Sequence, residues 1–354
     1  MKKLLILGTG GTIAGKAGSA SDHVGYTAGQ IGVADLLAGV PQGATLLAGV
    51  DVQLEQLAQL DSKDMDWPTM ARLALRCAKA VQDADTCAVL ITHGTDTLEE
   101  TSYFLHTVLS DVLREHPKPI VLTCAMRPAT SSEADGPGNL RDALAVALHV
   151  EATGVLCVCA GHIHHGALVQ KIHTYALDAF SSGDELSAGR ISAEALNGAN
   201  QALPAVVWAS QADRVTSKMP KQVIFKEKTT HVTVKWSCDA IENIVKIPVW
   251  PRVEILHNHA NADAWLVKAL LDQAARSEAP ALRGIVVAGT GNGTLGAAFE
   301  AALVSAVAQG VLVRRVSRCA FGRVQPTLHD ALPSAAGLNA AKARVAMVLE
   351  LLHV

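Results

Sequence analysis

Short apolar runs that alternate with helical patterns constrain the fold of the first two hundred residues more than any other feature. Four runs rich in Val, Ile and Leu have the character of buried parallel strands: Leu4–Leu7, Ala88–Thr92, Ile120–Cys124 and Val155–Ala160. Three segments between them carry apolar residues at helical spacing: Trp67–Val81, Leu98–Leu113 and Leu140–Glu151. The alternation predicts an α/β fold with a large, doubly wound, mostly parallel sheet, whose ligands bind beyond the carboxyl ends of the strands.

This pattern is interrupted between residues 201 and 228, where two prolines and a cluster of lysines occur. We therefore predict an N-terminal catalytic α/β domain over 1–203, a linker over 204–228 and a smaller C-terminal α/β domain over 229–354. The last of these is expected to hold strands and helices in the order Thr229–Trp236, Gly284–Ala288, Leu295–Ala308, Val311–Val316 and Asn339–Leu352.

The charge of the chain limits the classes of partner. A net charge of −3 argues against nucleic acid or an anionic membrane surface as a partner. Four basic residues at 314, 315, 318 and 323 are expected to form a solvated strand edge. No apolar run is long enough for a transmembrane helix, and Leu4–Leu7 is shorter than the roughly 7–15 residues of a signal-peptide core. Seven cysteines without a CxxC pair are typical of a reducing compartment, so we expect a cytoplasmic protein.

A glycine-rich turn, Gly8–Gly15, follows the first strand. Such a turn can direct backbone N–H groups at an anion or a developing oxyanion. Dinucleotide binding is one interpretation, but Ile13 stands where the GxGxxG pattern requires its third glycine, and no GxxxxGK[ST] loop occurs. The hydroxyl of Thr12 is instead a candidate nucleophile. The small, polar segment from 15 to 29 is compatible with a lid loop or with an ordinary surface loop.

A second polar turn, Thr92–Thr101, follows the strand that begins at Ala88. Asp96 or Thr97 could simply cap the next helix, and the sequence leaves that interpretation open beside a functional one. Helix capping is also the default interpretation of the polar turn Asp61–Met65.

Threonine needs a base because its hydroxyl is barely nucleophilic at neutral pH. Lys171 lies in an apolar run; most such lysines extend to solvent, but a buried one can lose its proton and accept one from a hydroxyl. Thr95, bridging to Lys171 beside Asp96, is one possible proton path. A serine hydrolase has less support, since no GxSxG occurs. The histidines in His162–His165 lack a carboxylate at zinc-ligand spacing, so we predict a polar loop and no metal.

These segments together resemble the bacterial-type L-asparaginase/glutaminase family. TGGTIAG (Thr9–Gly15) and HGTDTLEET (His93–Thr101) are similar to its two signature segments. The resemblance extends to residues near the C-terminus, through five further segments: Asp61–Met65, Ala125–Ser131, Ala134–Leu140, Gly289–Gly293 and Lys342–Arg344.

The resemblance implies hydrolysis of L-asparagine to L-aspartate and ammonia, with minor glutaminase activity and no cofactor. Thr12 would attack the side-chain amide carbon, with Tyr26 on the lid orienting or activating it. Thr95, Asp96 and Lys171 would form a proton-handling triad. The backbone N–H groups of Gly11 and Thr95 would be oxyanion donors, each worth about 2.7–4 kcal/mol in other hydrolases.

The resemblance also implies a substrate pocket and a homotetramer built as a dimer of dimers, in which a neighbouring subunit completes each site. The residues expected to bind the amino-acid substrate are Gly11, Ser62, Lys63, Thr95, Asp96, Ala125 and, from the neighbouring subunit, Asn261.

Two departures from the family pattern bear on the substrate. Position 63 is Lys, where family members carry a Gln that contacts the substrate's amino group. Phe321–Ser334 is short and offers no match to the acidic residue placed across the dimer interface, and Glu254 lies too far upstream. The missing acidic residue predicts a weaker grip on the α-ammonium group, and Lys63 would repel that group unless its side chain turns outward or pairs with Asp64. The alternatives are an amidase for a larger, tRNA-linked amide and a non-catalytic amino-acid sensor. The negative charge disfavours the first, and the retained Thr–Lys–Asp set disfavours the second.

Overall fold

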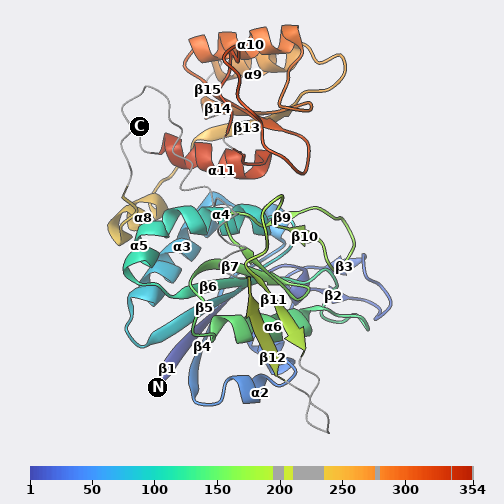
Figure 1. Cartoon of the computed structure of the whole chain (residues 1–354), viewed down its shortest axis with the longest axis vertical. Coiled ribbons are helices and arrows are strands. Elements are labelled where there is room, and N and C mark those ends of the chain that lie inside the picture. Colours follow the sequence, from blue (N-terminus) through green and yellow to red (C-terminus); the bar gives the residue numbers. More distant parts are fainter. Residues whose placement is uncertain (194–202, 210–234, 276–279, 336, 353–354) are drawn as a thin grey trace. The chain divides into compact units, whose positions relative to one another are not determined.

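A computed structural model describes residues 1–193, 203–209, 235–275, 280–335 and 337–352 of the chain. They form two compact units (Figure 1). The first contains the described residues up to 209 together with 235–246, and the second contains those from 247 onward. Each unit has its own sheet, so the predicted fold class, a large sheet domain followed by a smaller α/β domain, is confirmed.

The first unit alternates strands and helices along its length. Its strands are β1 (Lys2–Gly10), β2 (Lys16–Ala17), β3 (Tyr26–Thr27), β4 (Val50–Leu60), β5 (Thr86–Thr92), β6 (Pro119–Thr123), β7 (Gly154–Cys159), β8 (His162–His165), β9 (Gln170–Lys171), β10 (Phe180–Ser181), β11 (Gly189–Ala193) and β12 (Pro204–Trp208). Its helices are η1 (Thr12–Ala14), α1 (Val33–Ala38), α2 (Gly43–Leu46), η2 (Ser62–Asp64), α3 (Trp67–Gln82), α4 (Leu98–Val108), α5 (Ser110–Glu115), α6 (Gly136–Ala147) and α8 (Cys238–Val245).

The main sheet has eight strands in the order β12-β11-β8-β7-β6-β5-β1-β4. The pairings from β7 to β4 are parallel, and those from β7 to β12 are antiparallel. The chain runs from β1 to β4 on one side and then crosses to β5 on the other, so the strand order reverses at β1. In an open α/β sheet this reversal opens a crevice at the carboxyl ends of the strands. The crevice is therefore expected beyond the ends of β1 and β5.

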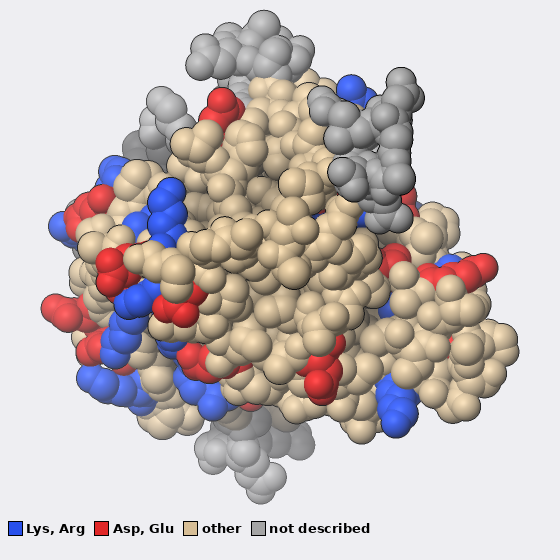
Figure 2. All heavy atoms as spheres, turned by 90° about the horizontal axis from the view of Figure 1, so that it is seen from below, with Lys and Arg blue, Asp and Glu red and all other residues tan. Residues whose placement is uncertain are grey.

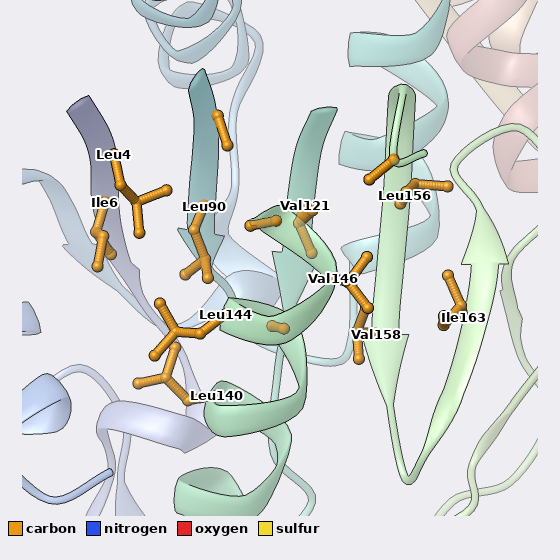
Figure 3. Packing of buried hydrophobic residues seen from close by; sticks show 14 of the residues in the cluster. Leu4, Ile6, Leu90, Val121, Leu140, Leu144, Val146, Leu156, Val158 and Ile163 are labelled. Atoms are coloured by element: carbon orange, nitrogen blue, oxygen red, sulfur yellow. The ribbon is translucent and has the colours of Figure 1, made fainter. Parts of the chain in front are cut away.

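The core of the first unit packs helix α6 against one face of the sheet (Figure 3). Alternate residues of β1, β5, β6 and β7 point toward Leu140 and Leu144 of this helix. Because successive side chains of a strand point to opposite faces, the intervening residues are buried on the other face, where α3 contacts β5 and α4 contacts β7. Burial of each large aliphatic side chain contributes about 1.5–3 kcal/mol, which fixes the sheet as a rigid base for its loops.

Several predicted boundaries differ from the structure. Residues 204–208, predicted as linker, form β12 and pair with β11 at the sheet edge. Helix α8, placed by sequence in the second domain, belongs to the first unit and contacts α3. The helix predicted over Leu98–Leu113 is broken near Leu109 into α4 and α5. Strand β4 was not predicted, because its side chains are largely half-exposed at a sheet edge and form no continuous apolar run. Most of the strand predicted at Thr229–Trp236 lies outside the described residues.

The second unit has a three-stranded parallel sheet in the order β13-β14-β15. Its elements are β13 (Arg252–His257), α9 (Trp265–Ala275), β14 (Leu282–Gly289), α10 (Ala297–Ala308), β15 (Leu312–Ser317) and α11 (Ala340–Leu351). The prediction that Arg314 and Arg315 line a solvated edge is wrong, since both are buried. Arg315 donates to the carbonyls of Leu332 (2.8 Å) and Gly293 (3.2 Å) and pairs with Asp330, so its charge is used to hold loops together.

The surface carries no large region of one charge on the face shown in Figure 2, where acidic and basic side chains are interspersed. Among the described helices, none is long and apolar enough to cross a membrane.

Candidate active site

The carboxyl end of β1 is a turn that only glycine can make. Gly10 and Gly11 have φ angles of 98° and 80°, in the left-handed region where a side chain is strained. The chain then enters the single turn η1, which begins at Thr12. Ile13 and Ala14 pack with Ala125 in a small apolar cluster, and this packing fixes the turn that presents Thr12.

The turn after β1 contacts the turn after β5. A Cβ on Gly11 would overlap the backbone of Gly94, and a Cβ on Gly94 would overlap the Oγ of Ser62. At the strand ends, the Oγ1 of Thr9 also donates to the carbonyl of Thr92 at 2.9 Å. Since Thr12 follows Gly11 and Thr95 follows Gly94, the two threonines lie on turns whose backbones are in contact. The sequence showed a glycine before each threonine but not that the glycines touch.

Lys171 joins Thr95 and Asp96 in a compact hydrogen-bonded group. Its Nζ donates to the Oγ1 of Thr95 at 2.9 Å and to the Oδ1 of Asp96 at 2.7 Å. The Lys171 side chain is only 20% exposed, so it does not extend into solvent. The Oγ1 of Thr95 also lies 3.4 Å from the Oδ1 of Asp96. The three side chains predicted to handle protons therefore contact one another, although 75 residues separate Asp96 from Lys171.

The structure decides the open question of helix capping in the second turn. The first residue before α4 is Thr97, and its side chain does not cap the helix. The Thr97 hydroxyl instead donates to the carbonyl of Ser62 at 2.7 Å, while Asp96 binds Lys171. The buried Ser62 accepts a hydrogen bond on its Oγ from the N–H of Asp96 (3.2 Å), so the polar turn after β4 is fastened to the turn after β5.

Lys63 forms its ion pair with a residue outside this group. Its Nζ pairs with the carboxylate of Asp61, two residues earlier, and its side chain is 64% exposed. The adjacent Asp61 carboxylate raises the pKa of Lys63, and the same carboxylate caps η2 by accepting from the Lys63 N–H. The longer helix that follows, α3, is capped instead by Asp66, which accepts from the N–H of Thr69. The cation at position 63 is therefore paired with a carboxylate two residues away.

Tyr26 comes from the segment predicted as a lid. Its Oη and the Oγ1 of Thr12 are 2.7 Å apart, and either oxygen could donate. Tyr26 lies on β3, which forms a short hairpin with β2, and its ring packs against Gly15. The hairpin therefore holds the hydroxyl of Tyr26 within hydrogen-bonding distance of the hydroxyl of Thr12, the candidate nucleophile.

The same segment is tied to the loop that follows β6. The N–H of Ala17 donates to the Oγ1 of Thr130 at 2.8 Å, and His23 Nδ1 and Ser131 Oγ are 2.9 Å apart. Asn139 fixes the start of that loop, because its Nδ2 donates to the carbonyl of Cys124 at 2.9 Å. Ala125 is thereby held beneath Ile13, and its own side chain is fully buried.

The backbone hydrogen bonds distinguish the N–H groups that were expected to be oxyanion donors. The N–H of Gly11 donates to the carbonyl of Leu60 at 2.8 Å, so it is already engaged within the sheet edge. Among the described residues, none accepts a hydrogen bond from the N–H of Thr12 or of Thr95. These two groups therefore differ from the N–H of Gly11, which already has an acceptor.

His93 is the first residue of the turn that follows β5. It is fully buried, and its Nδ1 lies 2.7 Å from the carbonyl of Gly94. Burial lowers its pKa to about 4, so the ring is neutral at physiological pH. Its role is to position Gly94 and not to carry charge.

Asn261 belongs to the second unit, where it is exposed and has a left-handed φ of 61°. The His-rich loop predicted at His162–His165 is instead strand β8, in which His164 is buried and its Nδ1 lies 2.9 Å from Ser182 Oγ. Within the described part of the chain, no group of three or more His, Cys, Asp or Glu side chains could hold a metal ion.

Comparison with known proteins matches both units to one family. Residues 3–203 match the family described as Asparaginase, N-terminal, and residues 252–353 match the Glutaminase/Asparaginase C-terminal domain. L-asparaginase 2 of Escherichia coli strain K12 is 34% identical, covering 99% of this chain and 89% of that protein. L-asparaginase 2 of Bacillus subtilis strain 168 is 32% identical, covering 99% of this chain and 83% of that protein.

A solved structure shares the whole fold. The crystal structure of a probable cytoplasmic L-asparaginase from Campylobacter jejuni aligns with a TM-score of 0.77 and 32% identity, covering 100% of this chain and 96% of that one. The fold, the two glycine turns and these matches agree, and the chain belongs to the asparaginase family.

Proposed function

We propose that this protein is an L-asparaginase that hydrolyses L-asparagine to L-aspartate and ammonia, with minor glutaminase activity. The observation that carries the proposal is a pair of hydrogen bonds, one between Thr12 and Tyr26 and one between Thr95 and Lys171. The two threonines lie on turns whose backbones are in contact. The names of the relatives support the substrate class.

In the first half-reaction the Oγ1 of Thr12 attacks the side-chain amide carbon. The hydroxyl proton passes to the Tyr26 oxygen as that phenol gives up its own proton in a relay, or through Thr95 to the amine of Lys171, and the amide oxygen gains negative charge. The free N–H groups of Thr12 and Thr95 are suitably placed to stabilise that charge, each worth about 2.7–4 kcal/mol by analogy with other hydrolases. When the C–N bond breaks, the proton goes to the leaving nitrogen, which departs as ammonia.

In the second half-reaction water attacks the ester formed on Thr12. One water proton returns to the Thr12 oxygen as the C–O bond breaks, and aspartate is released. Ser62 and Asp96, joined by a 3.2 Å hydrogen bond, would hold the α-carboxylate and α-ammonium of the substrate with Ala125 and, from a neighbouring subunit, Asn261. We further propose a homotetramer, which sedimentation can test, and a cytoplasmic location, which the similarity to the probable cytoplasmic L-asparaginase of Campylobacter jejuni supports.

Ammonia release from L-Asn, L-Gln and D-Asn tests the proposal. We expect L-Asn to be the best substrate of the wild type, and Thr12→Ala and Thr95→Ala each to lose activity. Thr69→Ala, a buried threonine on α3, is the matched control that keeps activity. Activity that survives both site substitutions would contradict the mechanism. Binding of L-Asn without turnover by the wild type would instead favour a sensor, and turnover only of a larger amide would favour the amidase alternative.

A further inference from the structure

The backbone around Lys171 receives little support from the main sheet. Lys171 lies on the two-residue strand β9, whose partner is the two-residue strand β10. Beyond this pair, the N–H of Ile172 donates to the carbonyl of Ala179 at 2.8 Å. A lysine side chain has four rotatable bonds, so the position of its Nζ depends on how firmly its backbone is fixed.

Glu99 provides a further anchor for that backbone. Its Oε2 accepts a hydrogen bond from the N–H of Lys171 at 3.1 Å. Glu99 lies in the first turn of α4, three residues after Asp96. The carboxylate of Asp96 holds the Nζ of Lys171 while that of Glu99 holds its N–H, so one turn of chain binds both ends of the lysine.

The same helical turn also holds the approach to β9. The Oγ of Ser102 donates to the carbonyl of Gly166 at 3.1 Å and to the carbonyl of Glu99 at 3.2 Å. The segment that carries Lys171 is therefore attached to the start of α4 at two points. Because α4 begins at Leu98, two residues after Asp96, these attachments help to set the distance between the lysine and the threonine it contacts.

We propose that Glu99 is a positioning residue, whose carboxylate fixes the backbone of Lys171 so that its Nζ reaches Thr95. This inference rests on the proposed function, because it concerns the proton path of that site. The rival explanation is that Glu99 only complements the dipole at the helix N-terminus, where any acidic side chain is favourable. The two explanations depend on different properties of the side chain, its reach and its charge.

Three substitutions separate reach from charge. Glu99→Asp keeps the charge but is one methylene too short, Glu99→Gln keeps the reach and an acceptor oxygen, and Glu99→Ala loses both. We expect kcat to fall about 10–100-fold in the Asp and Ala variants, by the usual effect of misplacing a reacting group by an ångström. Glu99→Gln should stay within about threefold of wild type, with KM for L-Asn changed less than kcat in every variant.

Thermal melting of the same proteins gives the second readout. Stability should follow charge, with Glu99→Asp near wild type and Glu99→Gln lower, so activity and stability rank the variants differently. Glu100→Asp shortens the neighbouring carboxylate in the same turn and is the matched control for kcat. Even if Glu99→Ala does not fold, the Asp and Gln variants complete the test. A kcat that follows charge, with Asp active and Gln impaired, would overturn the proposal.

Lys171→Met distinguishes this proposal from the proposed function. If Glu99 acts through Lys171, then Glu99→Asp should lower kcat no further in the Lys171→Met background. Full activity of Lys171→Met itself would contradict the proton path. Loss of activity in Lys171→Met together with wild-type kcat in Glu99→Asp would contradict only the role of Glu99.

Discussion

The Oγ1 of Thr12 and the Oη of Tyr26 lie 2.7 Å apart, although 14 residues separate them in the sequence. Thr12 begins η1, and Tyr26 lies on β3. A phenol at this distance can relay the proton of the threonine hydroxyl by giving up its own. Substitutions in the turn or in the hairpin therefore test how the two oxygens are held. Substitutions of Thr12 or Tyr26 test the hydroxyl groups themselves.

Tyr26→Phe should lower kcat for L-Asn by about 10²–10⁴-fold, the usual contribution of a positioned acid or base. The ring that packs on Gly15 is retained, so the melting temperature should stay close to that of wild type. Steady-state ammonia release gives kcat. Tyr175→Phe, at a half-exposed tyrosine, is the control and should keep full activity. A Tyr26→Phe enzyme with wild-type kcat would remove the phenol from the proton path.

Gly11→Ala should destabilise the first unit more than Gly49→Ala does. Both glycines have left-handed φ angles, 80° and 78°, so each alanine costs about 1–2 kcal/mol of backbone strain. Only Gly11 also faces a neighbouring backbone, that of Gly94, which adds about 1–3 kcal/mol of overlap. Urea unfolding measures the difference. Equal losses in the two variants would mean that the turns after β1 and β5 do not touch.

His93 should make the folded protein less stable as pH falls from about 6.5 to about 4. Its folded pKa is lowered by burial, so the unfolded state binds more protons in this window, and the unfolding free energy rises with pH across it. The full effect is about 3 kcal/mol, present above the window and lost below it.

Urea unfolding of wild type and His93→Asn at pH 4.5 and 7.5 measures this contribution. Wild type should lose more unfolding free energy between the two values than the variant does. His329→Asn, at an exposed histidine, should retain the pH dependence of wild type. Identical pH dependence in His93→Asn and wild type would show that His93 is not buried in neutral form.

Lys63→Gln should change kcat/KM for L-Asn by less than about threefold, because an exposed ion pair contributes little. The ammonium of Lys63 is directed to Asp61 and not to the Ser62–Asp96 pair. Steady-state kinetics at several concentrations of L-Asn tests this. A tenfold drop in KM in the Gln variant would place the cation inside the substrate pocket. It would then support the prediction that the wild type binds the substrate's α-ammonium group weakly.

The sequence predicted the parts of the fold whose side chains are buried on both faces. Strands β1, β5, β6 and β7 are continuous apolar runs, because helices cover the sheet on either side. Strand β4 and the antiparallel β12 were missed, since their half-exposed edge positions do not produce such a run. Helix α9 was missed as well, although its pattern is apolar.

By itself, the sequence determined which residues are proposed to carry the chemistry: a threonine after each glycine turn, an aspartate beside one of them, and a lysine in an apolar run. Local pattern can do this because strand ends, turns and residue type are encoded over a few positions. Only the tertiary structure decided that the Gly11 N–H is already bound to Leu60, that Lys63 turns to Asp61, and that Glu99 holds the backbone of Lys171. Except for the Lys63 pair, these contacts join segments 49 to 72 residues apart, and they depend on sheet register and backbone approach, which no local pattern specifies.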